Sequence, residues 1–340
     1  MQDNPTFLSI EADLGIGPMS SEVIEAVFRY SHYYRKQLML IASKNQIDYK
    51  GGYVNNWTTQ QLSEYVSKLR HLYNYSNVKI CRDHCGPGFN GSQDLSDTYE
   101  TIRNDIANGF DLIHFDFCHY EGPLDKRLEE TKKAIEFALN LNPKLLLEIG
   151  TDENMGTGYG PMNLSEIEKE MEYFKSFCSP QFYVVQTGSL IKEINQIGSF
   201  NKDFVSQVST IARSKGMRIK EHNADYLDKE SVALRKNLVG AMNIAPQFGV
   251  VQTVLTLNKC LSYGVDPSVF VDFCYESNKW SKWLSRNTKE NKMLCSIIAG
   301  HYNFSSESYK EIIRRLGEKE DIREYLIGNL MNIIDHYEGK

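Results

Sequence analysis

Short apolar runs alternate with amphipathic segments along most of the chain. Each run is rich in Val, Ile, Leu and Phe, and the segment after it has the 3.6-residue periodicity of a helix. This order predicts parallel strands joined by helices, because a crossover helix lets successive strands run in the same direction. Eight runs follow this pattern, at Phe7–Ile16, Gln37–Ala42, Val78–Arg82, Leu112–Phe117, Lys144–Ile149, Phe182–Gln186, Met217–Glu221 and Ala241–Ala245.

Polar residues at the boundaries of the helical segments agree with this interpretation. Ser20 or Ser21 can cap the first helix, and Thr58 or Thr59 the second. Asp94 begins the third helical segment. Each strand-helix unit spans roughly 30 to 40 residues, the length of a βαβ repeat. Eight such units close into a (β/α)8 barrel, which typically takes about 250 residues.

An open, doubly wound sheet is the competing architecture. It normally carries a Gly-rich phosphate loop after its first strand, and GIGPMS at residues 15–20 matches that fingerprint poorly. Residues 262–340 have no strand of comparable strength and are helical in pattern. The sequence therefore predicts an α/β fold, a (β/α)8 TIM barrel over residues 1–261 with a C-terminal helical extension over residues 262–340 packed on the barrel.

Composition narrows the class of protein. The 340 residues are 41% hydrophobic and 24% charged, with a net charge of -6, so a sizeable core can form. The acidic balance disfavours nucleic-acid binding, and no uncharged apolar stretch approaches the length of a membrane span. The N-terminal segment lacks the pattern of a secretory signal, and the seven scattered Cys suit reduced thiols. We therefore expect a cytoplasmic enzyme.

Titratable side chains gather where the apolar runs end, which is where a barrel carries its active site. Asp83 and His84 follow the third run, Glu148 ends the fifth, and His222 follows the seventh. Imidazole and carboxylate groups from separate strands can converge on one divalent cation, and a nearby carboxylate can act as a general base. Further strand-end residues that we expect to contact a substrate are Asn45, Gln46, Asp116 and Asp225.

These side chains also have structural interpretations. Asp83 can cap the next helix or close a turn, and His84 or His222 can be a semi-buried histidine with satisfied hydrogen bonds. His114 lies inside a strand, where it can point into the barrel or out toward a helix. An unpaired carboxylate at Glu148 would be costly at the end of an apolar strand, which favours a function for it.

Six segments together resemble a known family. They are KNQIDYKGGY at 44–53, RDHCGP at 82–87, IHFDFC at 113–118, EIGTDE at 148–153, VVQTG at 184–188 and EHNADY at 221–226. The non-catalytic subunits of class II tagatose-bisphosphate aldolase carry similar SNQ…GGY, GDHLGP, IHLD, IGTE, VVQPG and AHSTDY segments in the same order. IAGHYNFSSESY at 298–309 also resembles part of that family. Its wider superfamily consists of metal-dependent aldolases that are (β/α)8 barrels.

The resemblance implies a role in proton transfer for Asp83 and metal ligation by His84 and His222. The aldolases have a third ligand, a histidine, near the end of the sixth strand, where this chain has Gln186. A carboxamide oxygen can still ligate a cation, and Glu148 can supply a charged ligand. That set would favour a harder or more weakly held divalent ion than zinc alone, so Zn, Mn, Co and Ni are all candidates.

The resemblance also implies phosphate binding in the loops after strands six to eight. The corresponding residues are Gly188, Ser189, Asn223 and Asn243. The chain departs from the aldolases here, because it reads NADY at 223–226 in place of a Gly-rich segment. Phosphate recognition is therefore an expectation that rests on four positions and not on a complete motif.

The expected function is aldol chemistry on a phosphorylated or acidic keto-sugar, with a divalent metal, by an aldolase or a 4-epimerase. Asp83 or Glu148 would remove the hydroxyl proton as the C–C bond breaks. The alternative is a non-catalytic subunit that stabilises a partner class II aldolase, which Gln186 favours and the converging polar groups disfavour. A homo-oligomer is also compatible with the sequence. A sugar kinase is disfavoured, because the chain lacks a Gly-rich phosphate loop.

Overall fold

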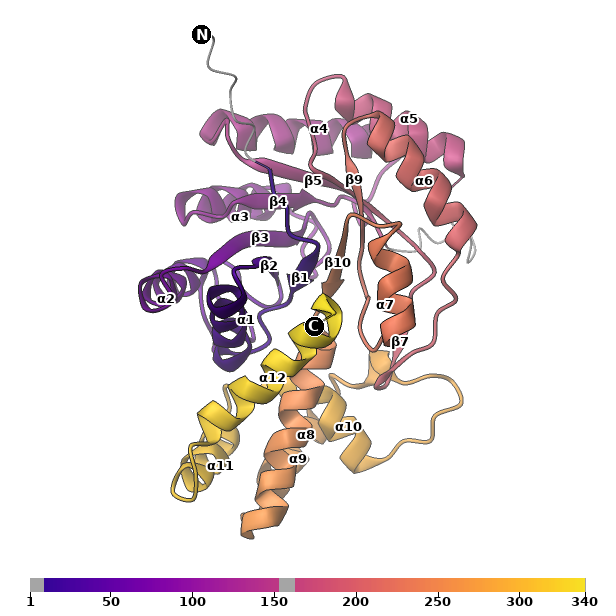
Figure 1. Ribbon diagram of the computed structural model, residues 1–340. Coiled ribbons are helices and arrows are strands. Elements are labelled where there is room, and N and C mark those ends of the chain that lie inside the picture. The colour runs from indigo at the N-terminus through magenta and orange to yellow at the C-terminus, as the bar shows by residue number, and fades with distance from the viewer. Residues whose placement is uncertain (1–8, 153–162, 340) are drawn as a thin grey trace.

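Eight parallel strands close into a barrel in the computed structural model, which describes residues 9–152 and 163–339. Their order around the barrel is β1-β10-β9-β6-β5-β4-β3-β2, and helices surround them (Figure 1). This confirms the predicted TIM barrel. The strands are β1 (Leu14–Ile16), β2 (Gln37–Ser43), β3 (Asn77–Cys85), β4 (Leu112–Phe115), β5 (Leu146–Thr151), β6 (Phe182–Val185), β9 (Arg218–Glu221) and β10 (Ala241–Ile244).

The crossover helices begin at the polar residues that the sequence indicates. Ser20 accepts a hydrogen bond from the backbone of Val23, and Thr58 and Asp94 cap the next two helices in the same way. Gly109 follows the third helix with a positive φ of 78°. The helices of the barrel are α1 (Ser21–Tyr34), α2 (Thr59–Leu72), α3 (Leu95–Ala107), α4 (Leu124–Leu141), α5 (Leu164–Lys175), α6 (Lys202–Ser214), α7 (Lys229–Lys236) and α8 (Pro246–Tyr263).

The first strand is shorter than the predicted Phe7–Ile16, of which residues 7 and 8 lie outside the described part. Ile10 and Ala12 are instead buried with residues of the barrel interior. The backbone N–H of Ile10 donates to the side chain of Gln181, and that of Ala12 donates to Gln37. Side-chain amides thus accept the hydrogen bonds of these backbone N–H groups, which a neighbouring strand would otherwise accept. The segment closes the N-terminal end of the barrel.

The barrel interior changes from apolar to polar along its axis. Leu112 and Phe182 fill its N-terminal part, whereas His114, Glu148 and Lys220 are fully or almost fully buried further along the same strands or their neighbours. Alternate residues of a strand face the same side, so the side chains that follow the apolar layer at a spacing of two also point inward. The polar end is the carboxyl end of the strands, where barrels carry their sites.

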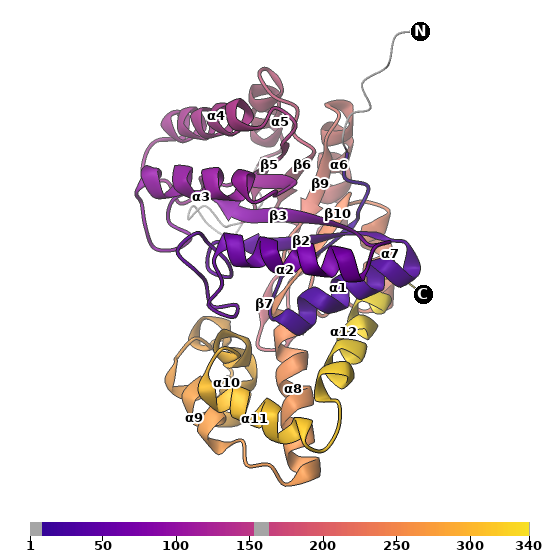
Figure 2. The same cartoon turned by 90° about the vertical axis from the view of Figure 1, so that its left-hand side faces the viewer.

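The C-terminal residues form the predicted helical extension. It has a hydrophobic core of its own, which includes Phe270, Trp280 and Phe304, while Leu330 of α12 joins the main core. Figures 1 and 2 show α12 beside α1 and α8. The expected division at residues 261 and 262 falls within α8. The elements of the extension are α9 (Ser268–Glu276), η1 (Ser281–Trp283), α10 (Lys292–Ala299), η2 (Gly300–Asn303), α11 (Glu307–Gly317) and α12 (Ile322–Glu338).

A small hairpin after β6 is the main element that the sequence does not predict. It consists of β7 (Ile191–Lys192) and β8 (Asn195–Gln196), which pair antiparallel. Two-residue strands carry too little hydrophobic pattern to be recognised from sequence. Within the described ranges, no helix combines the length and the apolar character needed to cross a membrane.

Candidate metal and substrate site

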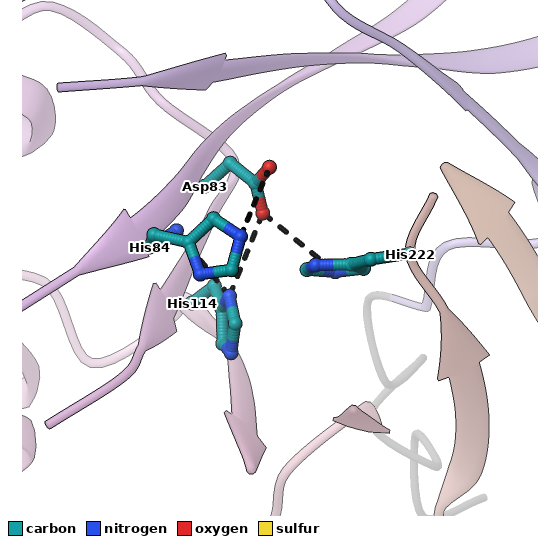
Figure 3. Close-up of side chains that lie close together, drawn as sticks. All are labelled: Asp83, His84, His114 and His222. Atoms are coloured by element: carbon teal, nitrogen blue, oxygen red, sulfur yellow. Dashed lines mark hydrogen bonds and ion pairs between the residues drawn. The ribbon is translucent and has the colours of Figure 1, made fainter. Parts of the chain in front are cut away.

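Four ionisable side chains converge inside the carboxyl end of the barrel (Figure 3). Asp83 and His84 come from β3, His114 from β4, and His222 directly follows β9. One potential ligand atom from each lies within 4.8 Å of those of the others. Asp83 Oδ1 lies 3.5 Å from His114 Nδ1 and 3.7 Å from His222 Nε2. The structure thus brings together two predicted metal ligands, the predicted catalytic Asp83 and one further histidine.

A local irregularity of β3 lets two consecutive residues reach the same cluster. In a regular strand, Asp83 and His84 would point to opposite faces. The pairing of β3 with β4 shifts register between Arg82 and Cys85, and His84 has a positive φ of 47°. An irregularity of this kind re-aims side chains and is common beside active sites. The strand therefore departs from regular geometry at the residues where both side chains turn toward the cluster.

Hydrogen bonds outside the cluster orient its histidines. His84 Nδ1 donates to Asp116 Oδ2 at 2.9 Å, and His114 Nε2 donates to the carbonyl of Gly150 at 2.9 Å. His114 Nδ1 accepts the backbone N–H of His84 at 3.3 Å. These bonds leave His84 Nε2 on the side of Asp83, whereas the single lone pair of His114 Nδ1 is taken by the His84 N–H, and this long bond would have to break for Nδ1 to ligate a metal. Such outer hydrogen bonds set the tautomer and orientation of metal-binding histidines.

Two more carboxylates border the cluster. Asp152 Oδ1 lies 3.3 Å from His222 Nδ1 and 3.7 Å from His84 Nε2. Glu148 Oε1 lies 3.4 Å from His222 Nε2, and its other oxygen forms a 2.6 Å ion pair with Lys220 Nζ. Burial alone would raise the pKa of Glu148, but the Lys220 charge and His222 bring it down to about 2. Glu148 is therefore a buried carboxylate anion.

The electrostatics of the cluster favour a bound cation. Burial would raise the pKa of Asp83, yet the neighbouring His84 and His222 hold it well below its usual range. Burial would lower the pKa of His84, but Asp83, Asp116 and Asp152 raise it to about 9. The carboxylates thus attract positive charge to the centre of the cluster, which either protons on the imidazoles or a divalent ion can supply.

The donor atoms themselves fit a metal ion. Among the described residues, Asp83 Oδ1, Asp152 Oδ1 and His222 Nδ1 are buried without a hydrogen bond of normal geometry, and the last two form a 3.3 Å ion pair with each other. Buried polar atoms are normally paired, so unpaired ones at one place need a partner that the protein does not provide. Three imidazoles and a carboxylate are ligands that Zn, Mn, Co and Ni accept. The residues therefore form a candidate metal site that suits any of these four ions.

Gln186, the predicted third ligand, makes hydrogen bonds to the backbone. Its side-chain nitrogen donates to the carbonyl of Asp152 at 2.9 Å, and its oxygen accepts the N–H of Gly188 at 2.8 Å. In this arrangement its amide links the ends of β5 and β6. Metal ligation by Gln186 stays a prediction, and it would use the second lone pair of the amide oxygen.

Two of the four predicted phosphate-binding residues, Ser189 and Asn223, lie close to carboxylates. The Ser189 hydroxyl donates to Glu221, which also pairs with Arg235 at 3.0 Å. Asn223 Nδ2 donates to Asp152 at 2.6 Å. Asn243 is buried, and neither polar atom of its side chain has a partner among the described residues. Their contacts with substrate, like that of Gly188, stay predictions.

Two of the other predicted substrate residues have structural partners. Asp116 orients His84, and it also accepts hydrogen bonds from Thr151 and from the backbone of Cys118. Asp225 accepts the backbone N–H groups of Ala245 and Gln247, at 3.0 Å and 2.8 Å. Burial outweighs these two bonds and raises the pKa of Asp225 to about 7. Both carboxylates therefore shape the loops of the site.

A cavity of about 610 Å³ opens beside the cluster. Asp83 and His84 line it, together with the predicted substrate residues Asn45 and Gln46. Its far wall comes from the C-terminal extension, which the sequence does not place near the site. The residues of that wall are Asn278, Lys279, Ser281, Lys282, Trp283, His301 and Tyr302. A volume of this size accommodates a small polar ligand.

His114 is the member of the cluster that the sequence leaves undecided. The signal that settles its direction is the spacing of two in His114-Phe115-Asp116, because alternate residues share a face. Phe115 belongs to the core between barrel and helices, so its neighbours point inward. His114 also pairs in register with Glu148 on β5. A residue two positions before a polar strand-end residue therefore points into the barrel with it and is a candidate for the same site.

Comparison with known proteins relates the fold to sugar enzymes. No protein-family model matches the chain. A solved structure of a probable tagatose 6 phosphate kinase from Sinorhizobium meliloti 1021 has a TM-score of 0.74 at 15% identity, over 94% of this chain and 91% of that one. A fructuronate-tagaturonate epimerase from Cohnella laeviribosi has a TM-score of 0.64 at 13% identity, over 97% and 81%.

The same comparison also finds a fructose-bisphosphate aldolase. The fructose-bisphosphate aldolase from Campylobacter jejuni has a TM-score of 0.57 at 13% identity, over 96% of this chain and 90% of that one. Identities this low establish similarity of fold and not of activity. The chain is therefore a TIM barrel that shares its fold with these enzymes and carries a partly buried His/Asp cluster at the carboxyl end of its strands.

Proposed function

We propose that this protein is a metal-dependent enzyme that makes or breaks a C–C bond of a keto-sugar by aldol chemistry. The observation that carries the proposal is the convergence of Asp83 with His84, His114 and His222. Asp83 and His84 also line the cavity of about 610 Å³, so a substrate can reach the cluster. A site that only stabilised the barrel would not need unpaired donor atoms beside a cavity.

The three histidines would hold the divalent ion, with Gln186 as the alternative ligand suggested by the sequence. When bound, such an ion supplies Lewis-acid polarisation of a carbonyl and an adjacent hydroxyl. Asp83 then accepts the hydroxyl proton as the C–C bond breaks, because it is anionic and borders the cavity.

Glu148 contributes differently from Asp83. It is fully buried, lies outside the cavity lining and is paired with Lys220 at 2.6 Å. We propose that Glu148 orients His222 through their 3.4 Å contact, so its effect on catalysis is indirect.

The fate of the aldehyde fragment separates two reactions. If the fragment leaves after bond cleavage, the enzyme is an aldolase, and if it rotates and recombines, the enzyme is a 4-epimerase. The fold neighbours include a fructose-bisphosphate aldolase and a fructuronate-tagaturonate epimerase. They support a phosphorylated or acidic keto-sugar as the class of substrate.

A screen of ketose phosphates and keto-sugar acids with added Zn, Mn, Co or Ni tests the proposal. We expect activity that EDTA abolishes and that Asp83→Asn and His222→Ala each lower by at least about a hundredfold. His71→Ala, an exposed histidine on α2, is the matched control. Protein that binds no divalent ion and turns over none of these compounds would contradict the proposal.

The second candidate function is a non-catalytic subunit of a class II aldolase. It is favoured by Gln186, which stands where those aldolases have a metal-binding histidine and bonds to the backbone here. Mixing this chain with a low-activity class II aldolase subunit distinguishes the two. Restored activity that survives His222→Ala would support the subunit role, because stabilisation by contact does not need the cluster.

A further inference from the structure

His301 is a buried histidine of the C-terminal extension that lines the cavity. It lies in η2 and is only 2% exposed. Its Nδ1 is buried without a hydrogen-bond partner among the described residues, and none of them bonds to its Nε2 either. Buried polar groups are normally paired, so an unpaired imidazole on the wall of a cavity indicates a partner that enters the cavity.

Two glycines bring His301 close to the barrel. Gly249 of α8 faces this histidine, and a Cβ there would lie 2.5 Å from the His301 Cβ and 2.9 Å from its Nδ1. Gly300 packs on α8 in the same way, since its Cβ would lie 2.2 Å from Thr253 Oγ1. Only a residue without a side chain allows so close an approach. Because α8 directly follows β10, this packing places His301 near the carboxyl end of the strands.

The same contact determines which edge of the imidazole is available. Cβ, Cγ and Nδ1 of His301 are the atoms nearest to Gly249. Nε2 lies on the part of the ring that is farthest from Cγ, so it is the nitrogen that remains for the cavity. In a neutral imidazole each nitrogen either donates or accepts one hydrogen bond, and a hydroxyl is a suitable partner in both cases.

The surroundings of His301 keep it neutral. Burial, together with the charge of Lys282, lowers the pKa of its imidazole to about 3. His84 and His222 differ in this respect, because the carboxylates around them raise their pKa values. A neutral imidazole has no charge with which to attract a phosphate or a carboxylate. Its suitable partner is a neutral hydroxyl, of which a sugar has several.

The neighbours of His301 suit the rest of a sugar. Tyr302 lines the same cavity, and its hydroxyl accepts a hydrogen bond of 3.2 Å from Trp283 Nε1. The centre of the Tyr302 ring lies 4.0 Å from that of His301 and 4.9 Å from that of Tyr53. Aromatic faces pack against the C–H groups of a carbon chain, and the polar groups at their edges fix its orientation.

We propose that His301 forms a hydrogen bond with a chain hydroxyl of the substrate whose carbonyl lies at the His/Asp cluster, and so selects hydroxylated substrates. The inference rests on the proposed function, because that function makes the ligand of the cavity a keto-sugar. It assigns recognition of one hydroxyl to the C-terminal extension. A site built to bond a hydroxyl discriminates against a ligand that lacks it, because the polar group of the protein is then left unpaired.

Calorimetric titration with matched ligands tests this role. Sorbitol 6-phosphate and hexyl phosphate have the same chain length and charge, but only the first carries hydroxyls along its chain. Gluconate and hexanoate form the corresponding pair of carboxylates. In His301→Phe, which keeps the ring and removes both nitrogens, we expect the Kd of sorbitol 6-phosphate or gluconate to rise by about three- to tenfold. The Kd of the matching ligand without chain hydroxyls should stay unchanged.

Two further variants separate recognition from packing. His301→Gln keeps a polar group and should recover part of the affinity, and His71→Phe, the same change at an exposed histidine of α2, is the control. An equal effect of His301→Phe on both members of a pair, an unchanged Kd, or no binding of either hydroxylated ligand by the unaltered protein would overturn this role. Loss of the proposed function is recognised separately, by protein that neither binds a divalent ion nor turns over a keto-sugar.

Discussion

Asp116 Oδ2 lies 2.9 Å from His84 Nδ1, and this hydrogen bond orients the imidazole. It places the proton on Nδ1 and turns Nε2 toward Asp83 and Asp152, at 3.9 Å and 3.7 Å. Burial would raise the pKa of Asp116, but His84 and His114 lower it, so the bond is charge-assisted. The same carboxylate accepts a hydrogen bond from Thr151 on the neighbouring strand.

The variant Asp116→Ala should weaken metal binding without removing a predicted ligand. Loss of a carboxylate that accepts a hydrogen bond from a metal-binding histidine typically lowers metal affinity by about 10- to 100-fold, and we expect a loss of this size here. Competition titration with a chromogenic chelator measures the change. Asp116→Asn should retain part of the affinity, because its amide oxygen can still accept from Nδ1. Asp125→Ala, on the exposed start of α4, is the control, and an affinity equal to it would contradict the role of Asp116.

A pair of variants decides which residue completes the ligand set. We expect His114→Ala to lose bound metal, because His114 Nδ1 faces Asp83 Oδ1 at 3.5 Å. We expect Gln186→Ala to keep most of it, because the Gln186 amide makes bonds of 2.8 and 2.9 Å to Gly188 and Asp152, whereas the 3.3 Å bond to His114 Nδ1 is more easily replaced by a metal. Metal content after dialysis, measured by atomic emission, gives the answer. The opposite result would assign the third ligand to Gln186.

Most strands and helices of the barrel can be predicted from the sequence, because each strand-helix unit has its own hydrophobic pattern and capping residues. Inward and outward faces differ in polarity, and capping residues such as Ser20 and Asp94 form bonds within their own helix. The beginning of the first strand is not readable in this way. Ile10 and Ala12 are as apolar as strand residues, but their partners Gln181 and Gln37 are distant in sequence.

The candidate site is readable only in part, for the same physical reason. Asp83, His84 and His222 stand at strand ends, which the barrel topology brings together. The direction of His114 depends on the register between β4 and β5, and the irregularity of β3 at His84 has no sequence signature. The wall of the cavity depends on contacts between Glu193 and Trp283 across 90 positions, which no local pattern encodes.

The Glu148–Lys220 ion pair is expected to be essential for stability. Lys220→Met would leave the fully buried Glu148 carboxylate without its 2.6 Å partner. Removing one member of a buried pair typically lowers the free energy of unfolding by about 3–5 kcal/mol. Urea denaturation followed by circular dichroism measures the loss. Lys220→Met/Glu148→Gln should recover most of it, and a double variant as unstable as the single one would argue against an uncompensated charge.

Asp225 should make the protein less stable as the pH rises toward neutrality. Its pKa is about 7 when folded, against an ordinary value of 3.8, because burial disfavours the anion. A raised folded pKa gives stability that is fully present below about pH 4 and is lost as the pH rises through about 7. Asp225→Asn cannot ionise, so it should escape this loss.

The comparison that isolates Asp225 is the difference in free energy of unfolding between the two proteins. This difference removes the contributions of groups common to both, including His84, whose pKa is also raised. We expect the free energy of unfolding of Asp225→Asn, relative to that of the unaltered protein, to rise by roughly a few kcal/mol between pH 4 and pH 8. Urea denaturation at four pH values across that window measures it. A difference that does not change with pH would show that Asp225 is already ionised at pH 4, held by the N–H groups of Ala245 and Gln247.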